Sequence, residues 1–153
     1  MNSLELRIPP VIVMLIVGTA MWMAAQLIPS VAAPPSVRAG LAIALGVIGV
    51  LVALAGVIVF RRAGTTLHPQ RPESSSAVVR SGVFACSRNP MYLGMLLVLL
   101  AWAAWLANVA SLVLAFAFVA YLNRFQIRPE ERVLAARFGA AYTEYMARVR
   151  RWL

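Results

Sequence analysis

The stretch MYLGMLLVLLAWAAWLANVASLVLAFAFVAY, residues 91–121, decides the fold class of this chain because it carries no charged residue. One membrane crossing takes about 20 apolar residues, so the stretch is too long for a single comfortable span. Asn108 lies near its middle and marks a turn. We therefore predict a helical hairpin whose two arms, residues 91–107 and 109–123, each cross a membrane.

Two further apolar stretches lie upstream, at residues 8–28 and 39–60. Each is long enough to cross a hydrocarbon core of about 30 Å. The first has an alternative as a signal peptide, because Val31-Ala32-Ala33 resembles a cleavage site of small residues. Its apolar run is longer than the roughly 7–15 residues usual in such peptides, and Arg7 is the single cation before it. We therefore interpret it as a span.

The composition agrees with a lipid environment. Of the 153 residues, 62% are hydrophobic and 12% are charged, whereas a soluble domain has about 25% charged residues. This excludes an ordinary cytosolic enzyme. All 14 cations are Arg, and the net charge is +9. Because these arginines lie beside apolar spans, we interpret them as topology signals that attract anionic lipid, and we expect no nucleic-acid partner.

A basic segment, residues 61–90, separates the second and third spans. Its arginines face a single acid, Glu73, and Gly, Pro and Ser are frequent. By the positive-inside rule the segment is cytoplasmic, and helical spans indicate a cell inner (plasma) membrane. Four spans then leave both termini in the cytoplasm. An irregular segment of this length usually has a function, so we expect it to form part of a cofactor site.

Residues 129–152 are predicted to form a cytoplasmic amphipathic helix, because their apolar side chains fall on one helical face. Glu130 and Glu131 share that side and need partners, since an unpaired buried charge is costly. Alternatively, the two glutamates only favour the positive end of the helix dipole. Residues 150–152, Arg-Arg-Trp, fit an interfacial anchor.

The whole chain, residues 1–153, is thus predicted to be one all-α, polytopic helical membrane domain with about four transmembrane helices plus a C-terminal amphipathic helix. A single cysteine, Cys86, allows no internal disulfide, and a single histidine, His68, leaves no zinc cluster. We expect no bound metal. Any chemistry must come from other polar groups gathered at one end of the bundle.

Three polar motifs return to one predicted surface, because the hairpin brings the chain back to the side it left. They are Gly64-Thr65-Thr66-Leu67-His68-Pro69, Ser87-Arg88-Asn89-Pro90-Met91-Tyr92, and Arg128-Pro129-Glu130-Glu131-Arg132 followed by Phe138-Gly139, Tyr142 and Tyr145. Simpler explanations exist for parts of them. Asn89 before Pro90 is a sound helix start, and the tyrosines suit a membrane interface.

Together with Val78-Val79-x-x-Gly82-Val83-Phe84, these motifs resemble the isoprenylcysteine carboxyl methyltransferase family, which is related to the phospholipid methyltransferases. The resemblance covers residues 61–152 and rests on the order and spacing of the motifs. It implies S-adenosylmethionine, bound in a cytosol-facing pocket, as the methyl donor. The cofactor-binding residues carried over are Ser76, Ala77, Val78, Val79, Phe84, Asn89, Pro90, Met91, Tyr92 and Glu130.

Two of these positions depart from the family pattern. The family usually has His where this chain has Asn89, and it tends to Tyr at the position of Phe84. Asparagine can hydrogen-bond a cofactor but does not titrate, and phenylalanine lacks the hydroxyl contact.

The chemistry of methyl transfer fits the residues of this chain. An in-line displacement at a sulfonium needs positioning and a dry site more than proton transfer, so neither a catalytic triad nor a metal is required. Glu130 suits the ribose hydroxyls or the positive end of the cofactor. Arginine suits the carboxylate of the cofactor or of a substrate. The candidate catalytic arginines are Arg88, Arg124 and Arg128.

The sequence therefore predicts an integral membrane methyltransferase that uses S-adenosylmethionine and releases S-adenosylhomocysteine. Its expected partners are the lipid bilayer and a lipophilic or prenylated acceptor: an isoprenylcysteine-like carboxylate, a thiol or a lipid head group. Two alternatives stay open. An NADPH-dependent, sterol-reductase-like enzyme would need clustered cations for a 2′-phosphate, whereas the glutamate pair favours the methyl donor. A non-catalytic adaptor that binds anionic lipid leaves that pair without a role.

Overall fold

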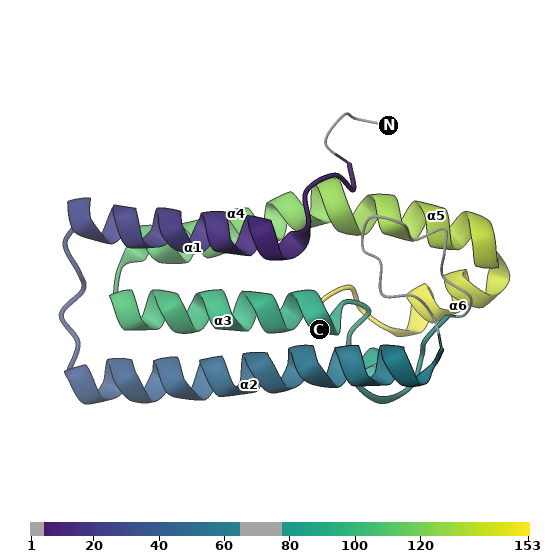
Figure 1. Cartoon of the computed structure of the whole chain (residues 1–153), viewed down its shortest axis with the longest axis horizontal. Coiled ribbons are helices and arrows are strands. Elements are labelled where there is room, and N and C mark those ends of the chain that lie inside the picture. The colour runs from purple at the N-terminus through teal and green to yellow at the C-terminus, as the bar shows by residue number, and fades with distance from the viewer. Residues whose placement is uncertain (1–4, 65–77) are drawn as a thin grey trace.

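Proline residues begin the first three long helices. α1 spans Pro10–Leu27, α2 spans Pro35–Arg62 and α3 spans Pro90–Leu106, each with proline in its first turn. Proline is favoured there because its φ angle already fits a helix and its missing N–H needs no partner. The computed structural model describes residues 5–64 and 78–153, and in these ranges the regular elements are all helical, as predicted (Figure 1).

α4, Val109–Leu122, begins after Asn108, which closes the hairpin with α3. The Asn108 side chain accepts hydrogen bonds from the backbone N–H groups of Ala110 and Ser111, at 2.9 and 3.3 Å. It also donates to the backbone carbonyl of Ile28 at 2.8 Å. The turn predicted at this residue is therefore confirmed. The buried side-chain amide of Asn108 is tolerated because both its oxygen and its nitrogen are hydrogen-bonded.

α4 continues through a π-helical turn, η3 (Asn123–Ile127), into α5 (Arg128–Phe138). This continuous helix, α1 and α2 are the three helices in the described ranges that are long and apolar enough to cross a membrane. α3 has 17 residues, which gives about 26 Å at 1.5 Å per residue, slightly short of a hydrocarbon core of about 30 Å. The count of four spans therefore stays a prediction.

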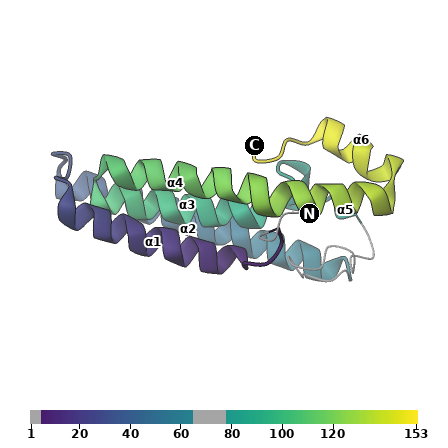
Figure 2. The ribbon, with the colours of Figure 1, turned by 90° about the horizontal axis from the view of Figure 1, so that it is seen from above.

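α3 is the central helix of the bundle and packs against α1, α2 and α4 (Figures 1 and 2). Its contact with α2 is close because glycines face each other. A Cβ atom added at Gly94 would lie 2.5 Å from the carbonyl oxygen of Gly49, and one added at Gly56 would lie 2.9 Å from Cγ of Met91. Small residues allow helix backbones to approach in this way in membrane proteins.

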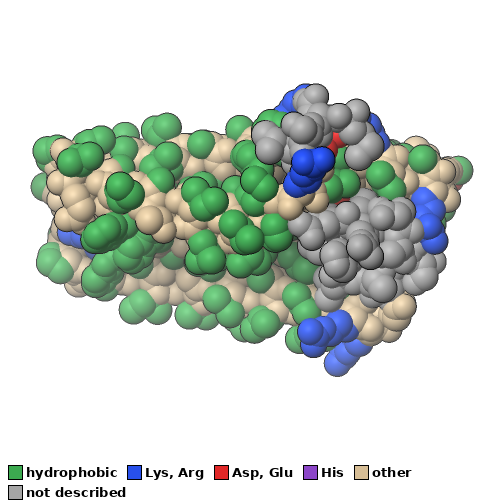
Figure 3. Space-filling model, turned by 45° about the horizontal axis from the view of Figure 1, so that its top comes forward, with side chains coloured by type: hydrophobic (Ala, Val, Ile, Leu, Met, Phe, Trp, Pro, Cys, Tyr) green, Lys and Arg blue, Asp and Glu red, His purple; other side chains and the backbone are tan. Residues whose placement is uncertain are grey.

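Both the inside and the outside of the bundle are apolar. Met21, Leu99, Phe118 and Leu122 belong to the buried core, while large apolar side chains cover the outer surface of the helices (Figure 3). A helix that is hydrophobic all round belongs either in a large core or in lipid. Because the chain is short, this surface indicates a bundle that lies in a membrane.

The C-terminal part differs from the single amphipathic helix expected over residues 129–152. α5 ends at Gly139, whose φ of 53° and ψ of −130° lie in a region that glycine adopts most readily. The chain then turns back as α6, Ala140–Arg148, and continues as residues 149–153, which we call the C-terminal strap. The break directs this strap back to the start of α3 (Figure 1).

Replacing Gly94 by alanine is expected to destabilise the bundle, because the added methyl group would meet the backbone of α2. Overpacking of this kind costs about 1–3 kcal/mol, so the midpoint of thermal unfolding in detergent should fall. Gly40→Ala is the matched control, since an added Cβ there has nothing within 4 Å. Equal midpoints for the two variants would contradict the close packing of α2 on α3.

Candidate functional site

The charged residues gather at one end of the bundle. Arginines lie at the end of α2, ahead of α3, along η3 and α5, and in the C-terminal strap, and Figure 1 shows these parts of the chain at the same end. Figure 3 shows arginine side chains around that end of the molecular surface. At the opposite end, Arg38 donates a hydrogen bond to the backbone carbonyl of Trp105 at 3.0 Å. The described part of the chain thus has one polar end, where a site can form.

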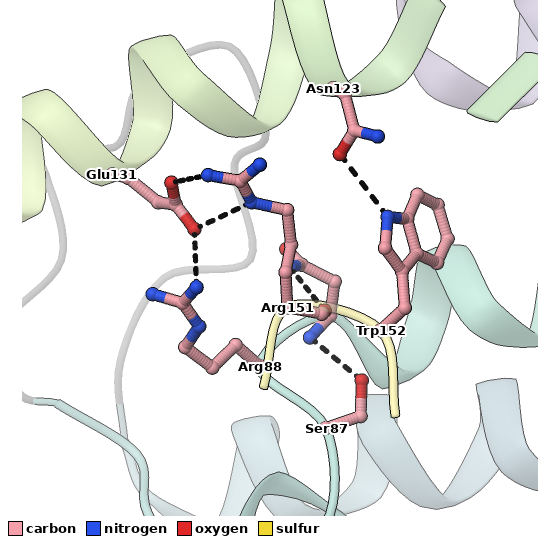
Figure 4. Close-up of polar contacts among 7 residues, drawn as sticks. Ser87, Arg88, Asn123, Glu131, Arg151 and Trp152 are labelled. Atoms are coloured by element: carbon pink, nitrogen blue, oxygen red, sulfur yellow. Dashed lines mark hydrogen bonds and ion pairs between the residues drawn. The ribbon is translucent and has the colours of Figure 1, made fainter. Parts of the chain in front are cut away.

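Glu131 is the centre of an ion-pair cluster at this end (Figure 4). Arg151 of the strap binds both carboxylate oxygens, with Nε 3.1 Å from Oε1 and Nη2 2.6 Å from Oε2. Arg88, ahead of α3, brings its Nη2 to 3.2 Å from Oε1. The Glu131 and Arg88 side chains are only 13% and 12% exposed. One carboxylate therefore pairs with two cations. The three groups together carry one net positive charge.

Arg88 has two donors to spare. Its Nε and Nη1 are buried and have no hydrogen-bond partner among the described residues. A buried charged donor without a partner costs free energy, and such groups in native structures call for an explanation such as a bound ligand. These donors suit an anion, because charge-assisted bonds from arginine to a carboxylate are strong.

Glu130, the neighbour of Glu131, is held by two uncharged donors. The Tyr92 hydroxyl donates to Oε1 of Glu130 at 2.8 Å, and Nε2 of Gln126 donates to the same oxygen at 2.5 Å. The second carboxylate oxygen, Oε2, takes part in neither bond. The two hydrogen bonds to Oε1 therefore fix the orientation of the Glu130 side chain, and neither of them uses Oε2.

The π-helical turn η3 brings several of these groups together. Turns of this kind are rare and occur frequently at functional sites. From η3, Gln126 reaches Glu130, and Oδ1 of Asn123 accepts a hydrogen bond from the indole of Trp152 at 3.1 Å (Figure 4). The turn thus joins the apolar α4 to the polar α5 and provides contacts to Glu130 and to the strap.

The C-terminal strap contacts the motif ahead of α3 through its backbone as well. The carbonyl of Arg150 accepts a hydrogen bond from the backbone N–H of Arg88 at 3.0 Å. The carbonyl of Arg151 accepts one from the side-chain amide of Asn89 at 2.9 Å. The strap therefore forms one wall of the polar end and positions the motif that carries the spare arginine donors.

Burial and charge also shift pKa values around the site. Burial raises the pKa of Tyr145 to about 12, so its hydroxyl stays protonated and donates to the carbonyl of Phe84 at 2.7 Å. Burial likewise raises the pKa of Tyr142. The hydrogen bond to Glu131 raises the pKa of Arg151. Both tyrosines are thus neutral near pH 7, while Arg151 keeps its charge.

Comparison with known sequences points to one family. The family model described as "Phospholipid methyltransferase" matches residues 37–141, more than half of the chain. The chain belongs to the phospholipid methyltransferase family. It is also 46% identical over 63 residues to an uncharacterized protein of Haemophilus influenzae, a match that covers 41% of this chain and 100% of that protein. No solved structure matches the chain.

This result confirms the resemblance found in the motifs at the level of the wider phospholipid methyltransferase family. Membership of this family implies methyltransferase activity, and the apolar helices indicate that the protein lies in a membrane. The matched range contains α3, α4, η3 and α5, and therefore most of the polar groups described above. Arg151 and Trp152 lie beyond it.

The structure brings together several residues that the family resemblance assigned to the cofactor. Tyr92 and Glu130 share a hydrogen bond. Asn89 stands at the N-cap position of α3, yet its side chain makes no capping bond and contacts the strap instead. The helix start predicted at Asn89-Pro90 is therefore confirmed, although the Asn89 side chain makes no capping hydrogen bond. Pro90 is buried at the start of α3.

Other predicted cofactor residues have different surroundings. Phe84 is buried in the short 3₁₀ helix η2, Gly82–Ala85, with its ring centroid 5.6 Å from that of Phe60. Met91 packs against α2 at Gly56. Val79 is buried and Val78 half-buried. Ser76 and Ala77, together with Thr65 to Pro69 of the first motif, lie outside the described residues.

The three candidate arginines are separated by their environments. Arg88 is largely buried and has spare donors, as shown above. Arg124 is exposed, pairs with Glu5 at 3.3 Å and lies over the ring of Phe125, 5.4 Å from its centroid. Arg128 is exposed. The geometry therefore favours Arg88 for binding an anion, while roles for the other two arginines stay predictions.

Three residues of the site were not predicted as such: Gln126, Arg151 and Trp152. The need for a partner of the paired glutamates was a usable signal, because buried carboxylates require one. Which residues are the partners could not be predicted, because Arg88 and Arg151 lie 43 and 20 positions away from Glu131 along the chain. Arg151 and Trp152 also looked like an interfacial anchor, which is a common use of such residues.

The N-terminal segment is attached to the same end. Oxygen atoms of Glu5, whose side chain is 3% exposed, lie 3.3 Å from Nη1 of Arg124 and 2.6 Å from Nη2 of Arg132. The backbone N–H of Leu6 donates to the carbonyl of Phe125 at 3.0 Å. Burial alone would raise the pKa of Glu5, but the bonds from Arg132 and Arg124 outweigh it, so the pKa is lowered.

Glu5→Gln is therefore expected to lower stability in a pH-dependent way. Because the folded-state pKa lies below the ordinary value of 4.5, the contribution of the carboxylate is fully present above that value and disappears as the pH falls through the folded-state pKa. Unfolding midpoints of wild type and variant should differ at pH 7 and converge on acidification. Glu144→Gln, at an exposed glutamate, is the control. A Glu5→Gln difference that does not change with pH would contradict this account.

Proposed function

We propose that this chain transfers a methyl group from S-adenosylmethionine to a lipophilic acceptor at the cytoplasmic face of the inner membrane. The observation that carries the proposal is the pair of buried donors on Arg88 that have no partner among the described residues, together with an oriented Glu130 beside the Glu131 that Arg88 contacts, in a phospholipid methyltransferase family member.

The residues at the polar end fit the chemical groups of this cofactor. Its methionine part carries a carboxylate, which matches the spare donors of Arg88. Its ribose hydroxyls and its positively charged end match the oxygen of Glu130 that lies outside the bonds from Tyr92 and Gln126. Anion-binding and cation-binding groups thus both lie at the polar end of the bundle. This combination suits a ligand that carries a carboxylate as well as positive charge.

When bound, S-adenosylmethionine supplies a methyl group on a positively charged sulfur, ready for in-line displacement. The protein then has to position the reactants and exclude water more than to transfer protons. Tyr92 and Gln126 hold Glu130 in one orientation. The buried Phe84, Tyr142 and Tyr145 limit access of water from the side of η2 and α6. Arg88 is the residue that we assign to the cofactor carboxylate.

A cleft between α1 and α2, with α3 as its floor, suits the hydrocarbon part of an acceptor. Its volume is about 660 Å³, within the range of pockets that hold small ligands. The lining is largely apolar and includes Trp22 and Trp105. The Thr19 hydroxyl donates to the carbonyl of Leu15 at 2.9 Å, and the Trp102 indole donates to the carbonyl of Gly18 at 3.2 Å. With those polar atoms satisfied, the cleft favours an alkyl or isoprenoid chain.

The distribution of charge supports the membrane orientation. The end of the bundle that holds the glutamate pair also holds nearly all of the described arginines, and cytoplasmic flanks of membrane helices are enriched in such residues. Glu5 and the C-terminal strap both belong to this end. We therefore propose a multi-pass protein with both termini and the site in the cytoplasm. The acceptor is a lipid head group, a thiol or an isoprenylcysteine-like carboxylate.

Calorimetric titration of the detergent-purified protein tests the donor. S-adenosylmethionine and S-adenosylhomocysteine should both bind, and Glu130→Ala should weaken binding at least tenfold, which corresponds to about 1.4 kcal/mol. The matched control is Glu144→Ala, because Glu144 is an exposed glutamate of α6; its affinity should equal that of the wild type.

NADPH is titrated in parallel as the ligand of the reductase alternative. Folded protein that binds NADPH and neither adenosyl ligand would overturn the proposal in favour of a reductase. Binding of none of the three would leave the adaptor that recognises anionic lipid.

A further inference from the structure

Arg151 and Arg88 compete for the same carboxylate. Oε1 of Glu131 lies 3.1 Å from Nε of Arg151 and 3.2 Å from Nη2 of Arg88, while Oε2 accepts a hydrogen bond from Nη2 of Arg151 at 2.6 Å. Arg151 therefore holds Glu131 in the side-on, two-bond arrangement that gives the strongest arginine–carboxylate pairs. Arg88 is left with a single, longer contact.

The consequence for Arg88 concerns its unused nitrogens. A side-on pair between Glu131 and Arg88 would use Nη2 and Nε of Arg88, the same two atoms that Arg151 uses in the present arrangement. Such a pair would consume one of the two spare donors and neutralise the Arg88 charge. In the present arrangement Arg151 holds both oxygens of Glu131, and Arg88 contacts Oε1 through Nη2. Figure 4 shows the two guanidinium groups approaching the Glu131 carboxylate from different sides.

We propose that Arg151 is a positioning residue that keeps Arg88 available to the carboxylate of the methyl donor by engaging Glu131. This inference rests on the proposed function, and it gives the C-terminal strap a role in recognising one particular group of the ligand. Arg151 itself acts through Glu131 and Arg88. Its effect should therefore appear with ligands that carry a carboxylate and vanish with ligands that lack it.

The rival explanation is that the Arg151 side chain only attaches the strap to the bundle. The other contacts of the strap distinguish this explanation from the proposal. The carbonyls of Arg150 and Arg151 bind the motif ahead of α3, and the Trp152 indole binds Asn123. These three bonds do not use the Arg151 side chain. Truncating that side chain therefore removes the ion pair with Glu131, while the strap keeps its three other hydrogen bonds.

The experiment compares two ligands in calorimetric titrations of the full-length protein in detergent. S-adenosylhomocysteine carries the amino-acid carboxylate, whereas 5′-methylthioadenosine has the same nucleoside and sulfur without the amino acid. Arg151→Ala should weaken binding of S-adenosylhomocysteine at least tenfold and change binding of methylthioadenosine less than twofold. Arg148→Ala, at an exposed arginine of α6, should change neither.

A second variant tests the competition directly. In the double variant Glu131→Gln with Arg151→Ala, the carboxylate that would capture Arg88 is replaced by an uncharged amide whose oxygen can still accept a hydrogen bond from Arg88, so S-adenosylhomocysteine affinity should recover by at least fivefold relative to Arg151→Ala alone. A merely structural role of Arg151 predicts that the double variant binds no better than the single one. Arg151→Lys keeps the charge but not the two-bond geometry, and should show the same ligand selectivity in a milder form.

The outcomes distinguish the two proposals. If the wild type binds neither ligand, the proposed function fails, and this inference fails with it. If the wild type binds both ligands, two results overturn the inference alone: an equal loss of both ligands in Arg151→Ala, or no loss of either. Should Arg151→Ala unfold, the ratio of the two affinities in Arg151→Lys decides, and an unchanged ratio overturns the inference.

Discussion

The shared carboxylate of Glu131 is the interaction on which the polar end of this protein depends. It lies between Arg88 and Arg151 and joins α5, the motif ahead of α3 and the C-terminal strap. A largely buried charge is stable only when it is paired, and this one is paired twice. These three groups carry one net positive charge, and two nitrogens of Arg88 have no partner within the described part of the chain. The ion pairs of Glu131 therefore both hold the polar end together and position the Arg88 donors that we assign to ligand binding.

The apolar part of the bundle serves this arrangement by holding the ends of helices in fixed positions. The glycine contact between α2 and α3 sets the start of α3, and with it Arg88 and Tyr92. The Asn108 cap returns α4 to the same end, where η3 and α5 carry Gln126 and the glutamates. In lipid, backbone groups must be satisfied within helices, so such a bundle is a rigid support.

The sequence predicted the all-α class and the hairpin at Asn108, because an apolar run without charge has few alternatives and a polar amide within it must be bonded. It also predicted that the glutamates and the motif ahead of α3 share one end. It did not predict the break at Gly139, since the apolar periodicity continues past that glycine. The roles of Gln126 and Arg151 depend on the π-helical turn and on a reversal of the chain, which are tertiary features that local patterns do not contain.

Transfer of a labelled methyl group is the most direct measurement of the central claim. Protein in liposomes of a total bacterial lipid extract, supplemented with a prenylated cysteine, is incubated with S-adenosylmethionine that carries tritium in its methyl group. The account predicts label in the lipid-soluble fraction for the wild type and its loss in Arg88→Ala. Release of the label by mild alkali would indicate a methyl ester, and resistance a thiol or head group. No lipid-soluble label above that of protein-free liposomes, with the protein folded, would contradict the account.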